Sequence, residues 1–300
     1  MSLRSDIDAE GLDALHDNPP AWRAVIEAIA QRHGGGIVEQ VGEGTVLVAR
    51  LGTTRMIKLY PPFLRDHFEF EREMLPMLQG RLSVDTPKLL ASGTLEGWPY
   101  LVMTQLAGEP LTRTWPGMNS AQRCALLHSL GVLAAQVHGL APGRLQMLAP
   151  GWGDFIHRQR SQCHARQQRT GLPAHLLEQL PEFIAGELPS GPAVPLTGEY
   201  TPFNLFTRDG VLAAMFDFGD GLVGPREYDW LGPLGFLAAG DARCCAAFMS
   251  GYGAVLDDAV RLRLLRLLLL HRYSHLPAQI ALPGWQRAPS FEALAALIWP

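Results

Sequence analysis

Three oxygen-bearing side chains around one short hairpin are the residues of this 300-residue chain best suited to chemistry. Glu199 is followed five positions later by Asn204, and Asp217 comes thirteen positions after that. The pair Asp209-Gly210 between two short apolar runs predicts a hairpin, which would let the three side chains converge. Phosphoryl transfer from ATP needs such a set, because a carboxylate accepts the proton of the attacking hydroxyl while Asn and Asp hold magnesium.

This order of residues resembles the catalytic loop and metal segment of protein-kinase-like enzymes, in which a carboxylate, four residues and an Asn precede Asp-Phe-Gly. Within that superfamily it is most similar to the aminoglycoside phosphotransferase and choline kinase family. The resemblance covers roughly residues 37–300, and the order of segments is most like hygromycin phosphotransferases. It implies an α+β, bilobal protein-kinase-like fold with a small β-rich N-lobe and a larger helical C-lobe.

Two residues of the loop depart from the family pattern. The family usually has His-Gly-Asp, and this chain has Thr197, Gly198 and Glu199 in the same frame, with Asn204 retained. Glu199 keeps the negative charge but extends one methylene further, about 1.5 Å. Because a catalytic base works through placement, the departure bears directly on activity.

Lys58 is the next candidate functional residue, because this chain strongly prefers arginine over lysine. Only Lys58 and Lys88 among its 25 basic residues are lysines. Lys58 lies in an apolar run, residues 55–60, that is typical of a strand, which favours a specific role over an exposed strand lysine. A kinase-like fold has at this place the lysine that contacts the α and β phosphates.

A lysine in that role needs a glutamate on the following helix. The apolar face of that helix is marked by residues at three- and four-residue spacing, Phe68, Leu75 and Leu78. Glu71 shares this face and is therefore the predicted partner of Lys58, with Glu73 as the other candidate. A role for Glu71 in only capping or solvating the first turn is the alternative. Pro76 predicts a kink, or a break of the helix near Leu75.

Two backbone segments complete the predicted nucleotide site. Gly42 and Gly44, between the first two strands, would let backbone amides approach a phosphate, although such a turn is also typical of a simple hairpin. The run 99–111 resembles the family's interlobe linker. By that resemblance, the carbonyl of Thr104 and the amide of Leu106 would face adenine.

The same linker provides the predicted domain boundary, because Gly108 and Pro110 end an apolar strand. We expect an N-terminal helical extension over residues 1–36, a nucleotide-binding N-lobe over 37–107 and a helical C-lobe over 108–300. In the C-lobe, the resemblance gives Asp229 a structural role in bracing the catalytic loop. His138, at the end of a long apolar helix, is typical of a satisfied core histidine.

Composition narrows the class of protein. A 47% hydrophobic content with a net charge of −4 indicates a soluble globular chain with a substantial core. The balanced charge offers no basic footprint for nucleic acid, and no apolar run is long enough for a membrane span. The acidic start of the chain does not resemble a secretory signal, so we expect a cytoplasmic protein. The cysteines are expected to be reduced core thiols, and the sequence does not indicate an oligomeric state.

The sequence therefore predicts an ATP- and magnesium-dependent phosphotransferase that acts on the hydroxyl of a small molecule, such as an aminoglycoside-like sugar. A nucleotide-binding, catalytically weak pseudokinase, acting as a regulator or scaffold, is the alternative. The replacements at Thr197 and Glu199 favour this alternative, whereas the intact Lys58, Asn204 and Asp217 favour the enzyme.

Overall fold

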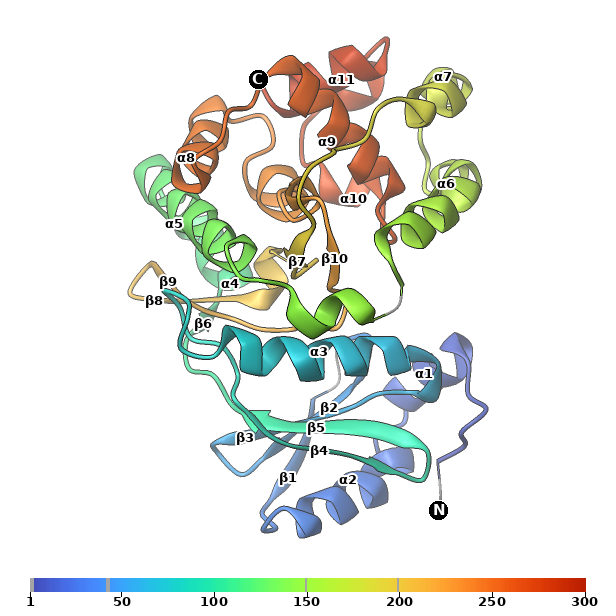
Figure 1. The fold of residues 1–300 in the computed structure, drawn as a ribbon, viewed down its shortest axis with the longest axis vertical. Coiled ribbons are helices and arrows are strands. Elements are labelled where there is room, and N and C mark those ends of the chain that lie inside the picture. The colour runs from blue at the N-terminus through green and yellow to red at the C-terminus, as the bar shows by residue number, and fades with distance from the viewer. Residues whose placement is uncertain (1–2, 42–43, 149, 199) are drawn as a thin grey trace. The chain divides into compact units, whose positions relative to one another are not determined.

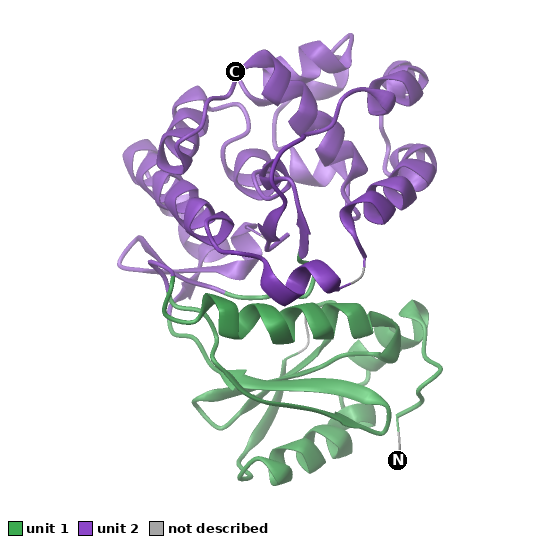
Figure 2. Ribbon diagram, in the orientation of Figure 1, with its two compact units in different colours: residues 1–81, 85–107, 216–221 green, residues 82–84, 108–215, 222–300 purple. Residues whose placement is uncertain are grey.

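The computed structural model describes residues 3–41, 44–148, 150–198 and 200–300. The chain forms two compact units (Figure 2). Unit 1 comprises residues 1–81, 85–107 and 216–221, and unit 2 comprises residues 82–84, 108–215 and 222–300. The chain therefore passes between the units several times, and a short segment that includes Asp217 belongs to unit 1.

Unit 1 is built on a five-stranded antiparallel sheet with strand order β1-β2-β3-β5-β4. Its strands are β1 (Val38–Val41), β2 (Leu47–Leu51), β3 (Arg55–Leu59), β4 (Leu89–Leu95) and β5 (Trp98–Thr104). The turn between β4 and β5 is Glu96-Gly97, with φ values of 53° and 85°. Two consecutive positive φ angles suit the right-handed twist of a tight hairpin.

Three longer helices accompany this sheet, α1 (Ala9–His16), α2 (Pro20–Arg32) and α3 (Arg65–Leu78). Helices α2 and α3 lie against opposite faces of the sheet (Figure 1). Trp22, Ile26 and Ile29 of α2 share one apolar core with Ile57 and Leu59 of β3. Because side chains alternate along a strand, Lys58 between those two points to the other face.

The expected break of the helix near Leu75 is wrong. Helix α3 continues through Pro76 to Leu78. Pro76 lies in the last turn, where it lacks the backbone N–H that would bond to the carbonyl of residue 72. Met74, Leu75 and Leu78 are fully buried in the same stretch, and their packing favours the helical conformation.

Unit 2 is mainly helical (Figure 1). Its helices are α4 (Leu111–Thr114), α5 (Ser120–His138), α6 (Trp152–Arg169), α7 (Ala174–Ala185), α8 (Ala242–Tyr252), α9 (Asp258–Leu270), α10 (Leu276–Gln279) and α11 (Phe291–Ile298). Helix α5 begins with a capping box, in which Asn119 and Gln122 each accept a hydrogen bond from the other's backbone N–H. No helix in the described ranges combines the length and apolar character that a membrane span requires.

Two small antiparallel sheets interrupt these helices. One pairs β7 (Val194–Leu196) with β10 (Leu222–Gly224), and the other has the order β6 (Glu109–Pro110), β8 (Leu205–Arg208), β9 (Val211–Met215). The predicted hairpin at Asp209-Gly210 is confirmed, with φ values of 52° and 76° between β8 and β9. Its register pairs Leu205 with Met215. The four cysteines are free; Cys163, Cys244 and Cys245 are buried, whereas Cys124 is half-buried.

Candidate active site

Lys58 lies between two carboxylates in unit 1. Its Nζ donates to Glu71 Oε2 at 2.7 Å and to Asp217 Oδ1 at 2.8 Å. The Lys58 side chain is 10% exposed, and that of Glu71 is fully buried. The contact between β3 and α3 follows from the alternation along the strand and the helical periodicity that places Glu71 on the buried face. The alternative candidate, Glu73, instead forms an ion pair with its neighbour Arg72.

Tyr60 is a member of this cluster that sequence reasoning missed. Its hydroxyl donates to Glu71 Oε2, the same oxygen that Lys58 contacts. Tyr60 lies two residues after Lys58, so the period-2 alternation of a strand is a signal that could have identified it. The other oxygen, Glu71 Oε1, is buried and has no hydrogen-bond partner among the residues that the structure describes, so within that part of the chain the carboxylate is held through one oxygen.

In this cluster, Lys58 and the neighbouring carboxylates stabilise one another's charged forms. Burial opposes the charge on Lys58, but Asp217 and Glu71 outweigh it and raise the pKa of the ammonium. Burial likewise opposes ionisation of Asp217, but Lys58 and the backbone N–H of Gly219 hold the pKa of that carboxyl below its usual range. Burial, and then the Glu71 charge, raise the pKa of Tyr60, which keeps its hydroxyl a donor. At neutral pH the cluster therefore holds a cationic lysine and an ionised Asp217.

Asp217 combines two features of a functional residue. It is one of three described non-glycine residues with positive φ, at 67°, and its side chain is 35% exposed. The segment 216–221 is also tied to α3 by His67, whose Nδ1 lies 3.5 Å from Asp220 Oδ1. A strained backbone conformation that keeps a carboxylate partly accessible is typical of functional sites.

The remaining predicted nucleotide contacts also lie in unit 1. Gly44 has a φ of 132°, which favours glycine, and Gly42 lies outside the described residues. The Thr104 N–H donates to the carbonyl of Lys88 at 3.0 Å, and its Oγ1 accepts from the Lys88 N–H at 2.9 Å. Leu106 is half-buried just after β5. The adenine and phosphate contacts of these residues stay predictions.

In unit 2, Asp229 braces the loop that precedes Glu199. Its Oδ2 accepts from the Thr197 N–H at 2.9 Å, and its Oδ1 accepts from the Gly198 N–H at 2.8 Å. His138 Nε2 lies 3.0 Å from Asp229 Oδ2, and since a carboxylate only accepts, Nε2 carries the donated proton. The structural role expected for Asp229 is confirmed, and His138 is a satisfied core histidine, as expected.

Asn204 ends a short 3-10 helix, Pro202–Asn204, and is buried at 9% exposure. It directly precedes β8, whose first residue Leu205 pairs with Met215. Asp217 follows Met215 by two residues along the chain. Glu199 lies outside the described residues, so its role as base stays a prediction.

The donors present fit magnesium better than a transition metal. In the described part of the chain, no three His, Cys, Asp or Glu side chains form a cluster that could hold a metal ion. Magnesium does not need such a cage, since it keeps several waters and binds through one or two carboxylates together with substrate phosphates. An ionised, partly exposed Asp217 suits this chemistry.

Comparison with known proteins identifies the family. The model of the phosphotransferase enzyme family, APH, matches residues 39–265. This is more than half of the chain, and the chain therefore belongs to that family of kinase-type enzymes. The comparison with curated proteins gave no significant match.

Solved structures share the fold at low sequence identity. The GDP complex of aminoglycoside 2'-phosphotransferase-IIIa is 15% identical, with 87% of this chain and 96% of that chain covered and a TM-score of 0.67. The streptomycin–ATP complex of APH(2'')-IIa is 14% identical, with coverage of 83% and 90% and a TM-score of 0.61. A macrolide 2'-phosphotransferase from Brachybacterium faecium is 19% identical, with coverage of 87% and 97% and a TM-score of 0.59.

These likenesses confirm the predicted bilobal α+β fold of protein-kinase-like phosphotransferases. The narrower expectation of a hygromycin phosphotransferase is not confirmed by them.

Proposed function

We propose that this chain is an ATP- and magnesium-dependent phosphotransferase that acts on a hydroxyl of a small molecule. The observation that carries the proposal is the contact of the buried Lys58 ammonium with Glu71 and with the partly exposed Asp217. Burying an ammonium held by two carboxylates costs desolvation free energy, so stability alone does not explain the arrangement. A role in positioning phosphate does explain it. Membership of the phosphotransferase family supports the same conclusion.

Each residue takes one role in this proposal. Lys58 binds oxygens of the α and β phosphates, and Glu71 fixes the position of its ammonium. Asp217 and Asn204 provide oxygen ligands for magnesium, which neutralises phosphate charge when it is bound. Gly42 and Gly44 would contribute backbone amides, and the backbone of Thr104 and Leu106 would bind adenine.

Glu199 acts on the acceptor. Its carboxylate takes the proton of the acceptor hydroxyl while the hydroxyl oxygen forms its bond to the γ phosphorus and ADP leaves with the bridging oxygen. Asp229 holds the amides of Thr197 and Gly198 and so limits the freedom of the loop that carries Glu199. Precise placement by such a brace suits a reaction that depends on positioning.

The proposed acceptor is a hydroxylated, sugar-bearing small molecule. Streptomycin lies in one structure of similar fold, and another such structure is a macrolide 2'-phosphotransferase. A nucleotide-binding regulator is the competing function, because Thr197 and Glu199 stand where the family usually has His and Asp. A screen of the purified chain with ATP, magnesium and a panel of aminoglycosides, macrolides and simple sugars, read by mass spectrometry, distinguishes the two.

Asp217→Ala tests the metal role separately from the acceptor. We expect loss of the magnesium-dependent part of ATP affinity with a retained folded structure, since Asp217 is partly exposed. Asp258→Ala is the matched control, because the Asp258 side chain is 93% exposed at the start of α9. Calorimetric titration with and without magnesium measures both variants. Unchanged magnesium-supported affinity in Asp217→Ala would remove Asp217 from the site.

A further inference from the structure

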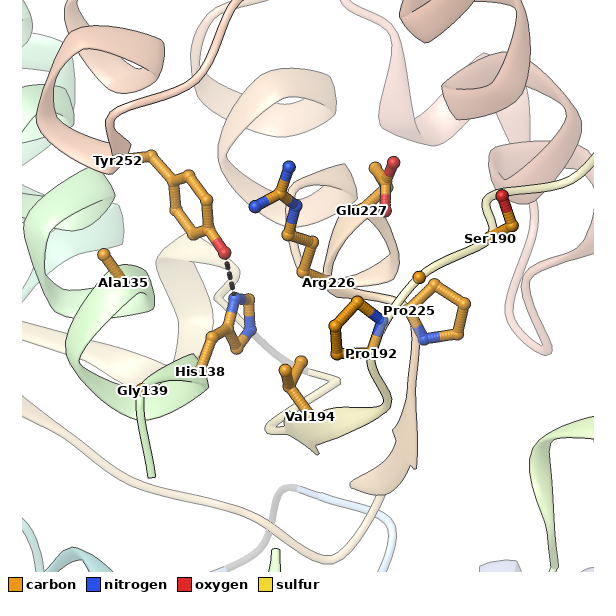
Figure 3. Close-up of a pocket in the computed structure, with 11 residues that line it drawn as sticks. Ala135, His138, Gly139, Ser190, Pro192, Val194, Pro225, Arg226, Glu227 and Tyr252 are labelled. Carbon is orange, nitrogen blue, oxygen red and sulfur yellow. Dashed lines mark hydrogen bonds between the residues drawn. The ribbon is translucent and has the colours of Figure 1, made fainter. Parts of the chain in front are cut away.

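A cavity in unit 2 has no role in the reaction proposed above. Its volume is about 460 Å³, and it lies among the end of α5, the segment before β7, the end of α8 and residues 225–227 (Figure 3). Its walls include His138, Pro192, Val194, Pro225, Arg226 and Tyr252. The size is within the range of small-molecule sites, about 300–1,000 Å³. None of its lining residues belongs to the proposed nucleotide, metal or base set.

One wall of this cavity is connected to the catalytic loop by hydrogen bonds. Figure 3 shows the hydrogen bond between the Tyr252 hydroxyl and the His138 ring. The hydroxyl oxygen lies 2.9 Å from His138 Nδ1, and His138 Nε2 donates to Asp229. Asp229 in turn accepts the N–H groups of Thr197 and Gly198. A molecule that displaces the Tyr252 hydroxyl or turns the His138 ring therefore changes the hydrogen bonds that hold the loop.

The chemistry of the cavity favours an anion. Arg226 is exposed, and its guanidinium lies 5.6 Å from the centre of the Trp230 ring and 5.7 Å from that of Tyr252. Among the described residues, no carboxylate forms an ion pair with Arg226. The carboxylate in the lining, Glu227, already has a cation near it, Arg263 at 3.9 Å. An arginine fixed over aromatic rings is preorganised to bind a carboxylate through two N–H groups.

Part of the remaining wall is apolar. Pro192, Val194 and Pro225 surround the space next to Arg226 (Figure 3). Their side chains offer no hydrogen bond to a polar ligand body, and contact with an apolar one removes surface from water. The cavity thus combines one cationic anchor with an apolar surface, which is the arrangement that small-molecule sites commonly use for orientation and affinity.

We propose that this cavity binds a small carboxylate with an apolar body, and that its occupancy is transmitted through Tyr252, His138 and Asp229 to the loop at residues 197–198. The residues that line this cavity are distinct from those assigned to the nucleotide, the metal and the base. Binding and transmission can both be measured on the full chain without any phosphotransferase activity. Their outcome therefore does not depend on the proposed reaction.

Binding is tested with benzoate, and with benzamide as its neutral analogue of similar shape. We expect saturable benzoate binding at millimolar concentration or better, and at least tenfold weaker binding of benzamide. Arg226→Gln should weaken benzoate at least tenfold. Arg243→Gln should leave it unchanged, because Arg243 is a 76% exposed arginine at the start of α8 that does not line the cavity. Equal binding of the two probes, equal binding by Arg226→Gln, or no saturable benzoate binding would each overturn the site.

Transmission is tested by following the Gly198 amide resonance of ¹⁵N-labelled protein during the benzoate titration. We expect this resonance to shift with the same midpoint as binding. Tyr252→Phe keeps the ring beneath Arg226 but removes the hydroxyl, so benzoate should still bind while the Gly198 shift becomes smaller. A Gly198 resonance that stays fixed at saturation, or a full shift in Tyr252→Phe, would overturn the connection to the loop.

Discussion

Lys58 is the residue on which the nucleotide site depends, and its removal should have two separable effects. Lys58→Met leaves Glu71 buried without its cation, and breaking a buried ion pair costs about 3–5 kcal/mol of the free energy of unfolding. The variant should also bind ATP much more weakly, while adenosine, which has no phosphate, should bind nearly as it does to the natural chain. Denaturant unfolding and calorimetric titration measure the two effects.

Lys88→Met is the matched control for this prediction, since Lys88 is the second lysine of the chain and is exposed. It should change neither stability nor ATP affinity appreciably. If Lys58→Met weakens adenosine and ATP equally, Lys58 serves folding and not phosphate binding.

For individual residues, some contacts could be predicted from the sequence and others could not. Glu71 was distinguishable because only its position in the helix coincides with the apolar stripe, and its neighbour Glu69 pairs locally with Arg65. The contact of His138 with Asp229 spans 91 positions and that with Tyr252 spans 114. No local period connects such positions, so tertiary packing alone brings them together.

Helices α5 and α8 illustrate how elements position the loop brace, because they carry His138 and Tyr252 and approach each other closely. A Cβ atom at Gly131 of α5 would lie 2.2 Å from the Phe248 carbonyl oxygen in α8, nearer than atoms can pack. Gly131→Ala should therefore separate the helices and lower the free energy of unfolding by about 1–3 kcal/mol or more. It should also weaken protection of the Gly198 amide from hydrogen exchange.

Gly153→Ala in α6 is the matched control, because it also replaces a helical glycine with alanine. A Cβ at Gly153 would meet no atom within 4 Å, and alanine is the better helix former. This variant should be neutral or more stable by up to about 1 kcal/mol. Equal destabilisation by both substitutions, in denaturant unfolding, would contradict the close packing of α5 against α8.

Elements with turn signals at both ends could be predicted from the sequence. Strands β1 to β5 and the Asp209-Gly210 hairpin follow from short apolar runs separated by glycine-containing turns. The break expected near Leu75 was wrong because a local rule for proline was weighed without the burial of Met74 and Leu78, which only the tertiary structure supplies.

For the whole molecule, we expect the free energy of unfolding to depend on pH because of His271. Burial, with Arg272 and Arg166 nearby, lowers the pKa of His271 to about 3, and its Nδ1 accepts from the Tyr273 N–H. Between about pH 3 and the ordinary histidine pKa near 6.5, the unfolded chain binds a proton that the folded chain does not. Stability is therefore lost as pH falls through this window, by up to about 1.4 kcal/mol per pH unit.

His271→Gln should make the decline between pH 6.5 and 4.5 shallower, because the proton uptake on unfolding is removed. His164→Gln, at an exposed histidine of α6, should retain the decline of the natural chain. Chemical unfolding at several pH values measures both. A decline that is as steep in His271→Gln as in the natural chain would show that other groups cause it.

The division of the whole chain was only partly accessible to sequence reasoning. The sequence predicts a strand end at Gly108 and Pro110, whereas β5 ends at Thr104 and Pro110 lies in β6. The structure passes from unit 1 to unit 2 between residues 107 and 108. The assignment of residues 216–221 to unit 1 has no local signal, since it depends on contacts such as that of Lys58 with Asp217 across 159 positions. The family resemblance identified the fold, whereas the acceptor is not encoded in the fold itself.

The most direct test of the proposed phosphotransferase is product formation by three forms that differ at residue 199, with the acceptor found in the screen. If the pocket is adapted to Glu199, Glu199→Asp should be slower because it withdraws the carboxylate, and Glu199→Gln should be slower still because it has no base. ATP binding should be similar in all three forms. Phosphorylated product formed equally fast by Glu199→Gln, or no product from the natural chain with any acceptor despite ATP binding, would contradict the proposed mechanism.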